Sequence, residues 1–336
     1  MNVCLNTYPW AFDTLGGGER QLLNYYSALM RGQHKWPNTR VSLFDMWNPR
    51  FAEMDLQHYF GCMPSGRDFL SYAKAIKGIP LVISPNFWPD PEGWAAAGVL
   101  DAIKTQLWLA DLVIVNSYIE EEALVRLMKI DSSRISVVHN AVDDIFFDPV
   151  APEIFRQKYD VQGPFILNVA NVEPRKNQHA FLKALKKFPD LTLVVVGGVR
   201  ERWYKDACEA EGGHQFRLIE PLESGSEMLR SAMAACEFFA MPSLVETPSI
   251  ASLEAAAAGA RLLTTELGST KEYFKDFATY VDPFDLDSLV AGVEAVLASV
   301  TNPDLRREVQ NHYTWDKVVE ALVTTYSIAT GNRFCL

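Results

Sequence analysis

Short runs of β-favouring residues alternate along this chain with longer segments of helical periodicity, and this alternation constrains the fold more than any other feature. The clearest unit runs from Phe165 to Gly198. Its middle segment carries apolar residues at helical spacing, namely Phe181, Ala184, Leu185 and Phe188. A strand, a helix and a second strand within roughly 30 residues are typical of a parallel βαβ unit. Repeated along the chain, the pattern predicts an α/β protein with two Rossmann-like, doubly wound parallel sheets, one in each half.

The same pattern divides the chain into expected elements and two domains. The expected strands are Val3–Asn6, Val41–Phe44, Leu81–Ser84, Leu112–Val115 and Ile135–Val138 in the first half, and Phe165–Val169, Leu191–Val196, Phe216–Ile219, Phe238–Met241 and Arg261–Thr265 in the second. The expected helices include Glu19–Met30, Trp94–Leu109 and Ile119–Lys129. Pro149 and Pro152 make Asp148–Glu153 hostile to a helix, so we expect the domain boundary there. The predicted domains are residues 1–150 and 151–312, with a ligand cleft between them.

Length and charge narrow the class of protein further. The 336 residues suffice for about two domains. Acidic residues (42) outnumber lysine plus arginine (31), which gives a net charge of −11. This balance disfavours a nucleic-acid partner and also a purely electrostatic attraction to an anionic membrane.

The spacing of the cysteines and histidines and the length of the apolar runs indicate whether the protein binds a metal and in which compartment it works. The five cysteines are odd in number and form no CxxC pair, which indicates neither a zinc site nor a disulfide framework. The six histidines show no metal-ligand spacing, so we expect them to be structural or exposed. No signal-peptide pattern is present, and no apolar run approaches the ~20 residues of a spanning helix. We therefore predict a cytoplasmic protein.

A glycine run within Leu15–Arg20 follows the first expected strand and opens a helix. Glycine lets backbone N–H groups approach a ligand, and a helix N-terminus favours an anion. The run lacks the spacing of the dinucleotide fingerprint and the acidic residue that accompanies it. It predicts either an anion-binding turn or a tight connection between strand and helix.

Two adjacent cations, Arg175 and Lys176, lie between an expected strand and an expected helix. Cations at a helix N-terminus conflict with the helix dipole, so a negative group such as a phosphate is expected to compensate. Asn177 is the candidate N-cap of the helix. The alternative is a solvated pair of loop charges.

Two carboxylates eight residues apart, Glu246 and Glu254, flank a predicted helix start. Thr247 is a plausible N-cap, with Pro248 at the first helical position. The N–H groups near Ser249–Ala251 would then face an anion, while the carboxylates reach polar groups of the same ligand. The alternative is a capped helix followed by an alanine-rich packing face.

These motifs together resemble glycosyltransferase family 4, retaining enzymes with two Rossmann-like domains in the GT-B architecture. The resemblance spans nearly the whole chain. The matching segments are Val138–Asp143 with Phe147 (the family's PNGVDxxxF), Phe165–Gln178 (its strand, loop and helix with a Lys-Asn), Glu246 and Glu254 (its E-x7-E), Ala257–Glu272 (its AxG…GG…E stretch) and Tyr313–Trp315 (the aromatic start of its final helix). In such folds the final helix returns to the N-terminal domain, so residues 313–336 are assigned there.

The resemblance implies a donor site in the second domain. Arg175 and Lys176 would bind the diphosphate of a nucleotide-sugar donor, together with the backbone at Ser249 and Ile250. Glu246 would contact the donor sugar near its anomeric carbon. Glu246, Lys176 and Arg175 are therefore the candidate catalytic residues.

The resemblance also implies roles around the rest of the donor. Glu254 would hydrogen-bond the nucleotide ribose, and residues around Ile219–Leu222 would meet the base. Gly17 and Gly18 would close on the phosphates or the acceptor from the N-terminal domain.

The chain departs from the family at two places. Ala170–Asn171 stands where the family usually has Gly-Arg, so Arg175 is expected to substitute for a missing phosphate-binding arginine. Pro85–Asn86 stands where many relatives have His-Asp. Asn86 can orient a hydroxyl but cannot act as a base at neutral pH. We expect Asn86 and Trp88 on the acceptor side, with the donor phosphate taking the acceptor proton unless the activity is altered.

The predicted function is a retaining, metal-independent glycosyltransferase without a cofactor. The acceptor would be a glycan or a lipid-linked saccharide in polysaccharide biosynthesis.

Asp285–Asp287 is nominally a DxD metal motif, but it precedes a helical pattern and is interpreted as a helix cap. The basic, aromatic segment Arg67–Lys77 predicts an amphipathic surface helix or, alternatively, a peripheral membrane contact. The rival functions are a non-catalytic binding or regulatory partner and an NAD-dependent dehydrogenase.

Overall fold

The computed structural model describes residues 1–13, 15–89 and 97–331, and it forms two compact units. The first comprises Met1–Asn140 and Trp315–Leu336, and the second comprises Ala141–Thr314. The division falls ten residues before the predicted boundary between residues 150 and 151. The reason is that the segment after Asn140 already packs in the second unit: Val142 N donates to Tyr313 O at 2.8 Å, and Phe146 is buried in that unit's core.

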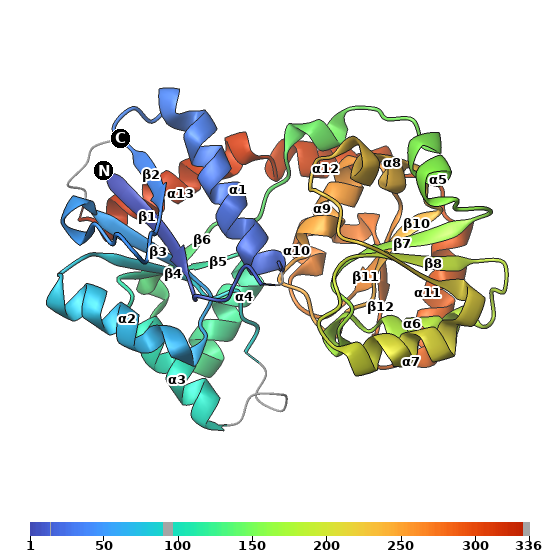
Figure 1. Cartoon of the computed structure of the whole chain (residues 1–336), viewed down its shortest axis with the longest axis horizontal. Helices are drawn as coiled ribbons and strands as arrows, with labels where there is room; N and C mark the ends of the chain where they lie inside the picture. The colour runs from blue at the N-terminus through green and yellow to red at the C-terminus, as the bar shows by residue number, and fades with distance from the viewer. Residues whose placement is uncertain (14, 90–96, 332–336) are drawn as a thin grey trace. The chain divides into compact units, whose positions relative to one another are not determined.

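The first unit contains a parallel sheet of six strands in the order β2-β1-β3-β4-β5-β6 (Figure 1). The strands are β1 (Asn2–Thr7), β2 (Arg40–Leu43), β3 (Leu56–Phe60), β4 (Leu81–Ser84), β5 (Leu112–Val115) and β6 (Ile135–Val137). The order turns back after β2, so β1 and β3 flank a topological switch point, where ligands bind in open α/β sheets.

The prediction missed β3, and its composition explains why. Its residues are LQHYF, and all five are buried. Gln57 and His58 break the apolar run that marks a fully buried parallel strand. His58 is nevertheless accommodated, because its ring nitrogens lie 2.8 Å from Tyr326 Oη and 2.9 Å from Ser84 Oγ.

Helices cover the first sheet. They are α1 (Gly17–Arg31), α2 (Arg67–Ser71), α3 (Ala97–Leu109), α4 (Tyr118–Ala123) and α13 (Trp315–Ala329). One-turn π-helical segments extend α2 through Ile76 and α4 through Met128. The last helix, α13, packs against α1 and β4, which confirms that the C-terminal helix returns to the N-terminal domain. The first three residues of the expected helix Trp94–Leu109 lie outside the described residues.

The second unit contains another parallel sheet of six strands, in the order β12-β11-β10-β7-β8-β9 (Figure 1). The strands are β7 (Phe165–Val169), β8 (Thr192–Val196), β9 (Phe216–Ile219), β10 (Phe238–Met241), β11 (Leu262–Thr265) and β12 (Thr279–Val281). Counted from β7, this is the doubly wound order 3-2-1-4-5-6 read from the other edge, with its switch point between β7 and β10. The short edge strand β12 was not predicted.

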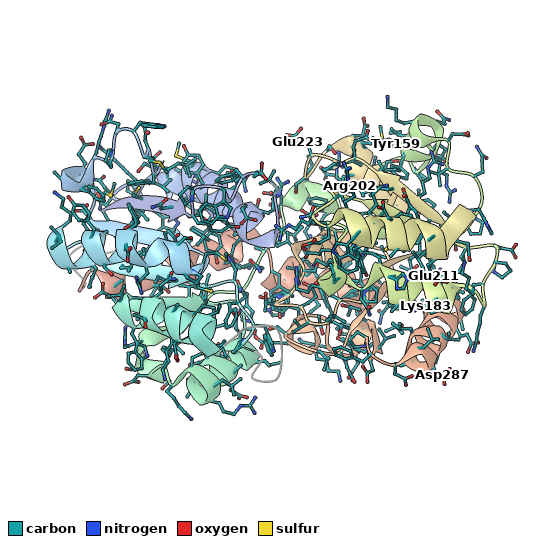
Figure 2. All side chains as sticks on the ribbon, turned by 60° about the horizontal axis from the view of Figure 1, so that its bottom comes forward. Tyr159, Lys183, Arg202, Glu211, Glu223 and Asp287 are labelled. Atoms are coloured by element: carbon teal, nitrogen blue, oxygen red, sulfur yellow. The ribbon has the colours of Figure 1, made fainter. Side chains whose placement is uncertain are left out.

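Helices also cover both faces of the second sheet. They are α5 (Glu153–Tyr159), α6 (Gln178–Leu185), α7 (Arg202–Gly212), α8 (Glu227–Ala235), α9 (Ile250–Ala257), α10 (Thr270–Phe274), α11 (Leu286–Ala298) and α12 (Pro303–His312). Phe181, Ala184 and Leu185 of α6 are buried in the core, as their spacing predicts, whereas Lys183 on the same helix is exposed (Figure 2). In the described part of the chain, no helix is both long and apolar enough to cross a bilayer.

Candidate active site

The switch point of the second sheet places two of the predicted motifs side by side. β7 ends at Val169 and β10 ends at Met241, and these neighbouring strands run in the same direction. Their carboxyl ends therefore lie at one edge of the sheet. A backbone hydrogen bond joins the two loops that follow, since Leu244 N donates to Arg175 O at 2.9 Å.

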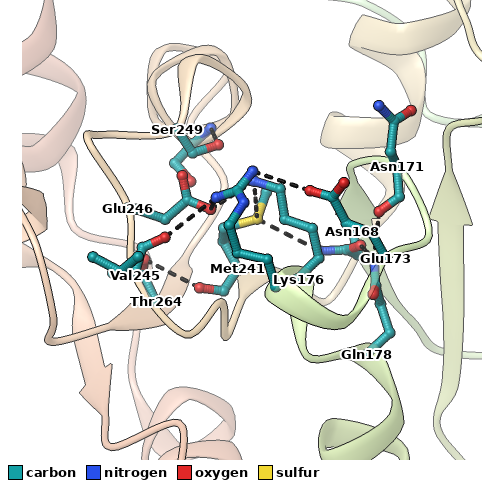
Figure 3. Close-up of polar contacts among 12 residues, drawn as sticks. Asn168, Asn171, Glu173, Lys176, Gln178, Met241, Val245, Glu246, Ser249 and Thr264 are labelled. Carbon is teal, nitrogen blue, oxygen red and sulfur yellow. Dashed lines mark hydrogen bonds and ion pairs between the residues drawn. The ribbon is translucent and has the colours of Figure 1, made fainter. Parts of the chain in front are cut away.

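A buried ion pair lies at the centre of this edge (Figure 3). Lys176 Nζ is 2.6 Å from Glu246 Oε1, and Arg175 Nη1 is 3.6 Å from the same oxygen. Glu246 is only 5% exposed. Residues seventy positions apart in sequence thus form one cluster, and it contains all three candidate catalytic residues.

The surroundings determine the charge of this pair. Burial disfavours the ionised form of Glu246, but Lys176 and Arg175 outweigh it and hold the pKa of Glu246 below its usual value. Burial lowers the pKa of Lys176, and so does the neighbouring Arg175, while Glu246 acts in the opposite direction. The two adjacent cations therefore repel each other, and a further negative group would relieve that repulsion.

A second carboxylate, Glu173, extends the cluster to a cation that the motifs did not reveal. Glu173 lies 3.1 Å from Arg175 Nη2 and 3.4 Å from Arg200 Nη1. Arg200 follows β8, the strand next to β7, and its N–H donates to Val172 O at 3.2 Å. Three cations thus meet two carboxylates, which leaves one net positive charge for an anion. The position of Arg200 just after a strand was the signal available in the sequence.

A tight backbone contact fixes Glu246. Its N–H donates to Leu267 O at 3.3 Å, and its carbonyl accepts from Ser269 N at 2.8 Å. Between these two residues, Gly268 has φ +95°, and a Cβ there would lie 2.0 Å from Glu246 O. Only glycine fits this position, so the chain after β11 holds Glu246 in an extended conformation.

The helix after Glu246 begins later than its motif predicts. Thr247 is not the N-cap and Pro248 is not the first helical residue. Ser249 is the N-cap, with Oγ accepting from Ser252 N at 3.2 Å, and α9 starts at Ile250. The backbone pairing of Glu246 with the segment around Gly268 delays the helix, and the N-terminus of α9 remains next to the ion cluster in sequence and at the same sheet edge.

Glu254 lies one turn into α9 and is also only 5% exposed. Ser224 Oγ donates to Glu254 Oε1 at 2.7 Å. Ser224 belongs to the loop after β9, which begins within the segment Ile219–Leu222 that the resemblance places near the base. Sequence spacing did not reveal Ser224, because 30 residues separate it from Glu254.

Two capping predictions have different outcomes. Asn177 occupies the N-cap position of α6, but at φ +60°, and its side chain does not cap the helix; Nδ2 instead donates to Pro283 O at 2.8 Å. Asp285 caps α11 by accepting from Asp287 N at 3.0 Å, which confirms the helix-cap interpretation of the DxD sequence. Within the described ranges, no group of three or more His, Cys, Asp or Glu side chains is placed to hold a metal ion.

The remaining candidates belong to the first unit. Gly17 and Gly18 open α1, and Glu19 Oε2 accepts from Gly16 N at 2.8 Å, so the glycine run forms the capped N-terminus of α1 and not a tight connection to β1, which ends at Thr7. A Cβ on Gly18 would lie 3.1 Å from Asn86 Nδ2, which brings these two predicted residues together. Asn86 has φ +49°, and Trp88 is partly buried.

The fold defines the GT-B class, with two doubly wound domains, and a cluster of two cations and a carboxylate lies at the switch point of the second. The chain belongs to glycosyltransferase family 4. Residues 22–145 match the model described as Glycosyltransferase Family 4, and residues 151–313 match the model described as Glycosyl transferases group 1. Together the two matches cover most of both units.

The curated relatives are longer than this chain. The D-inositol 3-phosphate glycosyltransferase of Mycobacterium ulcerans is 25% identical over 239 residues, which cover 66% of this chain and 51% of the relative. The alpha-maltose-1-phosphate synthase of Mycolicibacterium smegmatis is 23% identical over 290 residues, covering 76% of this chain and 74% of the relative. The chain spans about half the length of the first of these relatives.

Solved structures share the fold along almost the entire chain. HepE of Anabaena, solved with UDP-glucose, superposes with a TM-score of 0.80 at 17% identity, covering 98% of this chain and 100% of HepE. Sucrose-phosphate synthase from Thermosynechococcus elongatus superposes with a TM-score of 0.77 at 16% identity, covering 99% and 100% of the two chains. At these identities the likeness establishes the GT-B fold.

Proposed function

We propose that this chain is a retaining, metal-independent glycosyltransferase. It moves a hexose-like sugar from a nucleotide-diphosphate donor to a hydroxyl of a glycan or lipid-linked acceptor, in the synthesis of polysaccharide. The observation that carries the proposal is the cluster of Lys176, Arg175 and Glu246 at the switch point of the second unit. HepE was solved with UDP-glucose, which makes UDP-glucose the first donor to test.

The cluster supplies what departure of a nucleoside diphosphate requires. The bond between the anomeric carbon and the phosphate oxygen breaks through an oxocarbenium-like state, and negative charge grows on the departing phosphate. Lys176 and Arg175 stabilise that charge, with the N–H groups at the start of α9 as further donors. Two cations and a helix N-terminus can do this without a metal ion.

Charge balance gives Glu246 a second role. In the free protein the Glu246 carboxylate forms ion pairs with Lys176 and Arg175, the two cations that we assign to the diphosphate. When the donor binds, the phosphates share Lys176 and Arg175, and the Glu246 carboxylate can face the developing positive charge at the anomeric carbon. The ion pair thus keeps both groups ionised and in place before the donor arrives.

We assign the acceptor proton to an oxygen of the departing phosphate. Asn86 orients the acceptor hydroxyl but cannot take its proton. The acceptor oxygen bonds to the anomeric carbon on the face that the phosphate leaves, and its proton passes to the departing phosphate oxygen. Attack from that face keeps the configuration of the anomeric carbon, which is why we propose retention.

An NMR assay of transfer tests this proposal. The protein is incubated in EDTA with α-linked sugar nucleotides, beginning with UDP-glucose, and with saccharide and inositol phosphate acceptors. The expected product carries an α-linked sugar, identified by its anomeric proton coupling, and one nucleoside diphosphate is released per transfer. A β-linked product would contradict retention, and activity that appears only with added Mg²⁺ or Mn²⁺ would contradict metal independence.

The rival functions make different predictions. Membership of the glycosyltransferase family counts against a dehydrogenase. A non-catalytic partner would bind the donor without releasing nucleoside diphosphate. It would also keep its function after Glu246→Gln, whereas the proposed enzyme loses transfer.

We also propose a peripheral membrane contact through the first unit. A connected cluster of rings joins the segment after β2 to α2 and its π-helical extension, and it consists of Phe44, Phe51, Phe69 and Tyr72. In the sequence segments that contribute these rings, Trp47 is 92% exposed and Ile76 is 70% exposed. Lys77 Nζ lies 5.5 Å from the Tyr72 ring centre. Exposed apolar side chains with neighbouring cations are typical of a surface that inserts into a lipid interface.

The double substitution Trp47→Ser and Ile76→Ser is expected to weaken sedimentation with vesicles of phosphatidylcholine and phosphatidylglycerol at least fivefold. The loss of two inserting apolar side chains costs about 1 kcal/mol or more. Trp203→Ser is the matched control, because Trp203 is an exposed tryptophan on the second unit. Equal sedimentation of the double variant and the unaltered protein would contradict the membrane contact.

A further inference from the structure

Ser224 makes a side-chain contact with Glu254 that the motifs did not predict. Its hydroxyl donates to Glu254 Oε1 at 2.7 Å, a length typical of a hydrogen bond to a charged acceptor. Glu254 comes from α9, which follows the inner strand β10, whereas Ser224 comes from the loop after the edge strand β9. The contact therefore joins the loop after β9 to helix α9, near the carboxyl edge of the sheet where we place the donor.

The loop around Ser224 has a defined geometry. Gly225 follows it at φ +75°, a conformation that favours glycine. Ser226 then caps α8, because its Oγ accepts from Leu229 N at 3.2 Å and its own N–H donates to Glu223 O at 3.1 Å. The Ser224 hydroxyl is thus presented from a rigid turn immediately before a helix.

The hydrogen bond from Ser224 restricts rotation of the Glu254 side chain. A glutamate side chain has three rotatable bonds, and fixing them only when a ligand binds costs affinity. The hydrogen bond from Ser224 fixes the Glu254 carboxylate before the ligand arrives. An ionised carboxylate only accepts hydrogen bonds, so a ligand that matches it presents hydroxyl or N–H donors.

We propose that Ser224 is a positioning residue that orients Glu254 toward the vicinal hydroxyls of the donor ribose. Through this contact the site prefers ribonucleotides to 2′-deoxyribonucleotides. The proposal rests on the proposed function, which assigns the donor to this site. A 2′-deoxynucleotide makes one hydrogen bond fewer with the buried Glu254 carboxylate. The resulting loss of affinity is largest when the carboxylate is held in place and cannot rotate toward another partner.

Calorimetry with pairs of nucleotides tests the proposal on the full chain. UDP, GDP and ADP are each titrated, and the base that binds most tightly is then compared with its 2′-deoxy form. We expect the unaltered protein to prefer the ribonucleotide about tenfold or more. Ser224→Ala is expected to lower this ratio to about threefold or less, and Ser224→Thr, which keeps the hydroxyl, is expected to restore it.

Ser226→Ala is the matched control, because its hydroxyl lies in the same loop but bonds the backbone of α8. It should lower thermal stability and leave the ribose preference unchanged. A ratio in Ser224→Ala equal to that of the unaltered protein would overturn the role of Ser224. Equal binding of both nucleotides by the unaltered protein would overturn the ribose contact. Failure of all three nucleoside diphosphates to bind would overturn the proposed function itself.

Discussion

Replacing Lys176 with alanine is expected to weaken binding of the nucleoside diphosphate about 100-fold, which corresponds to about 2.7 kcal/mol. Lys176 is only 12% exposed beside Glu246, and a charge so little exposed to water interacts more strongly with a phosphate than the charge of the more exposed Arg175. The substitution also leaves the Glu246 carboxylate without its nearest counter-ion, so a bound anion would meet a less compensated negative charge. Titration calorimetry with the preferred nucleotide measures the loss.

Lys183→Ala provides the matched control for this experiment. Lys183 is an exposed lysine on α6, the helix that follows Lys176 (Figure 2). Its removal should change affinity less than twofold, as expected for a surface charge. Equal affinities of Lys176→Ala and the unaltered protein, with thermal unfolding showing that both are folded, would contradict the assignment of the cluster to the donor diphosphate.

The second large effect concerns the stability of the first unit at low pH. His58 is fully buried, stacks on Phe60 with ring centres 4.1 Å apart, and lies between Tyr326 and Ser84. Burial lowers the pKa of His58 from 6.5 to about 3. The unfolded chain therefore binds a proton first as the pH falls, and stability decreases between about pH 6.5 and pH 3. We expect this residue alone to remove about 2 kcal/mol between pH 7 and pH 5.

Urea unfolding at pH 7 and pH 5, followed by tryptophan fluorescence, measures this loss. Seven of the eight tryptophans belong to the first unit, so the signal reports mainly on the unit that contains His58. His58→Gln should be less stable at pH 7 but should lose about 2 kcal/mol less on acidification, whereas the exposed control His214→Gln should behave like the unaltered protein. An identical pH dependence for His58→Gln would contradict the account of the buried neutral imidazole.

Strand predictions succeeded where apolar runs were continuous. Phe165–Val169 and Phe238–Met241 agree with the structure without a shift. β3 was missed because the cost of burying His58 is offset by hydroxyl groups of β4 and α13, which are distant in sequence. The start of α9 was wrong because pairing with the chain after β11 keeps Glu246 extended. Local propensity contains neither of these tertiary effects.

The sequence predicts which residues form the site, but it does not predict which of them contact one another. The motifs identified Lys176 and Glu246, and the strand order then brings them to 2.6 Å. The links of Arg200 to Glu173 and of Ser224 to Glu254 join segments that follow different strands. No spacing rule within a single segment reveals them, because they depend on which strands end at the same edge of the sheet.

Thermal unfolding of the full chain with a panel of nucleotides tests whether the second unit binds a nucleoside diphosphate without a metal ion. The panel contains UDP, GDP, ADP, their common sugar conjugates and NAD, all in EDTA. We expect stabilisation by one nucleoside diphosphate and its sugar conjugates, about 2.7 kcal/mol at 100 times the dissociation constant, with no effect of NAD. The same shift should be strongly reduced in Lys176→Ala. Unchanged unfolding with every nucleotide, or a shift that requires a divalent metal, would contradict a metal-free donor site at the switch point of the second unit.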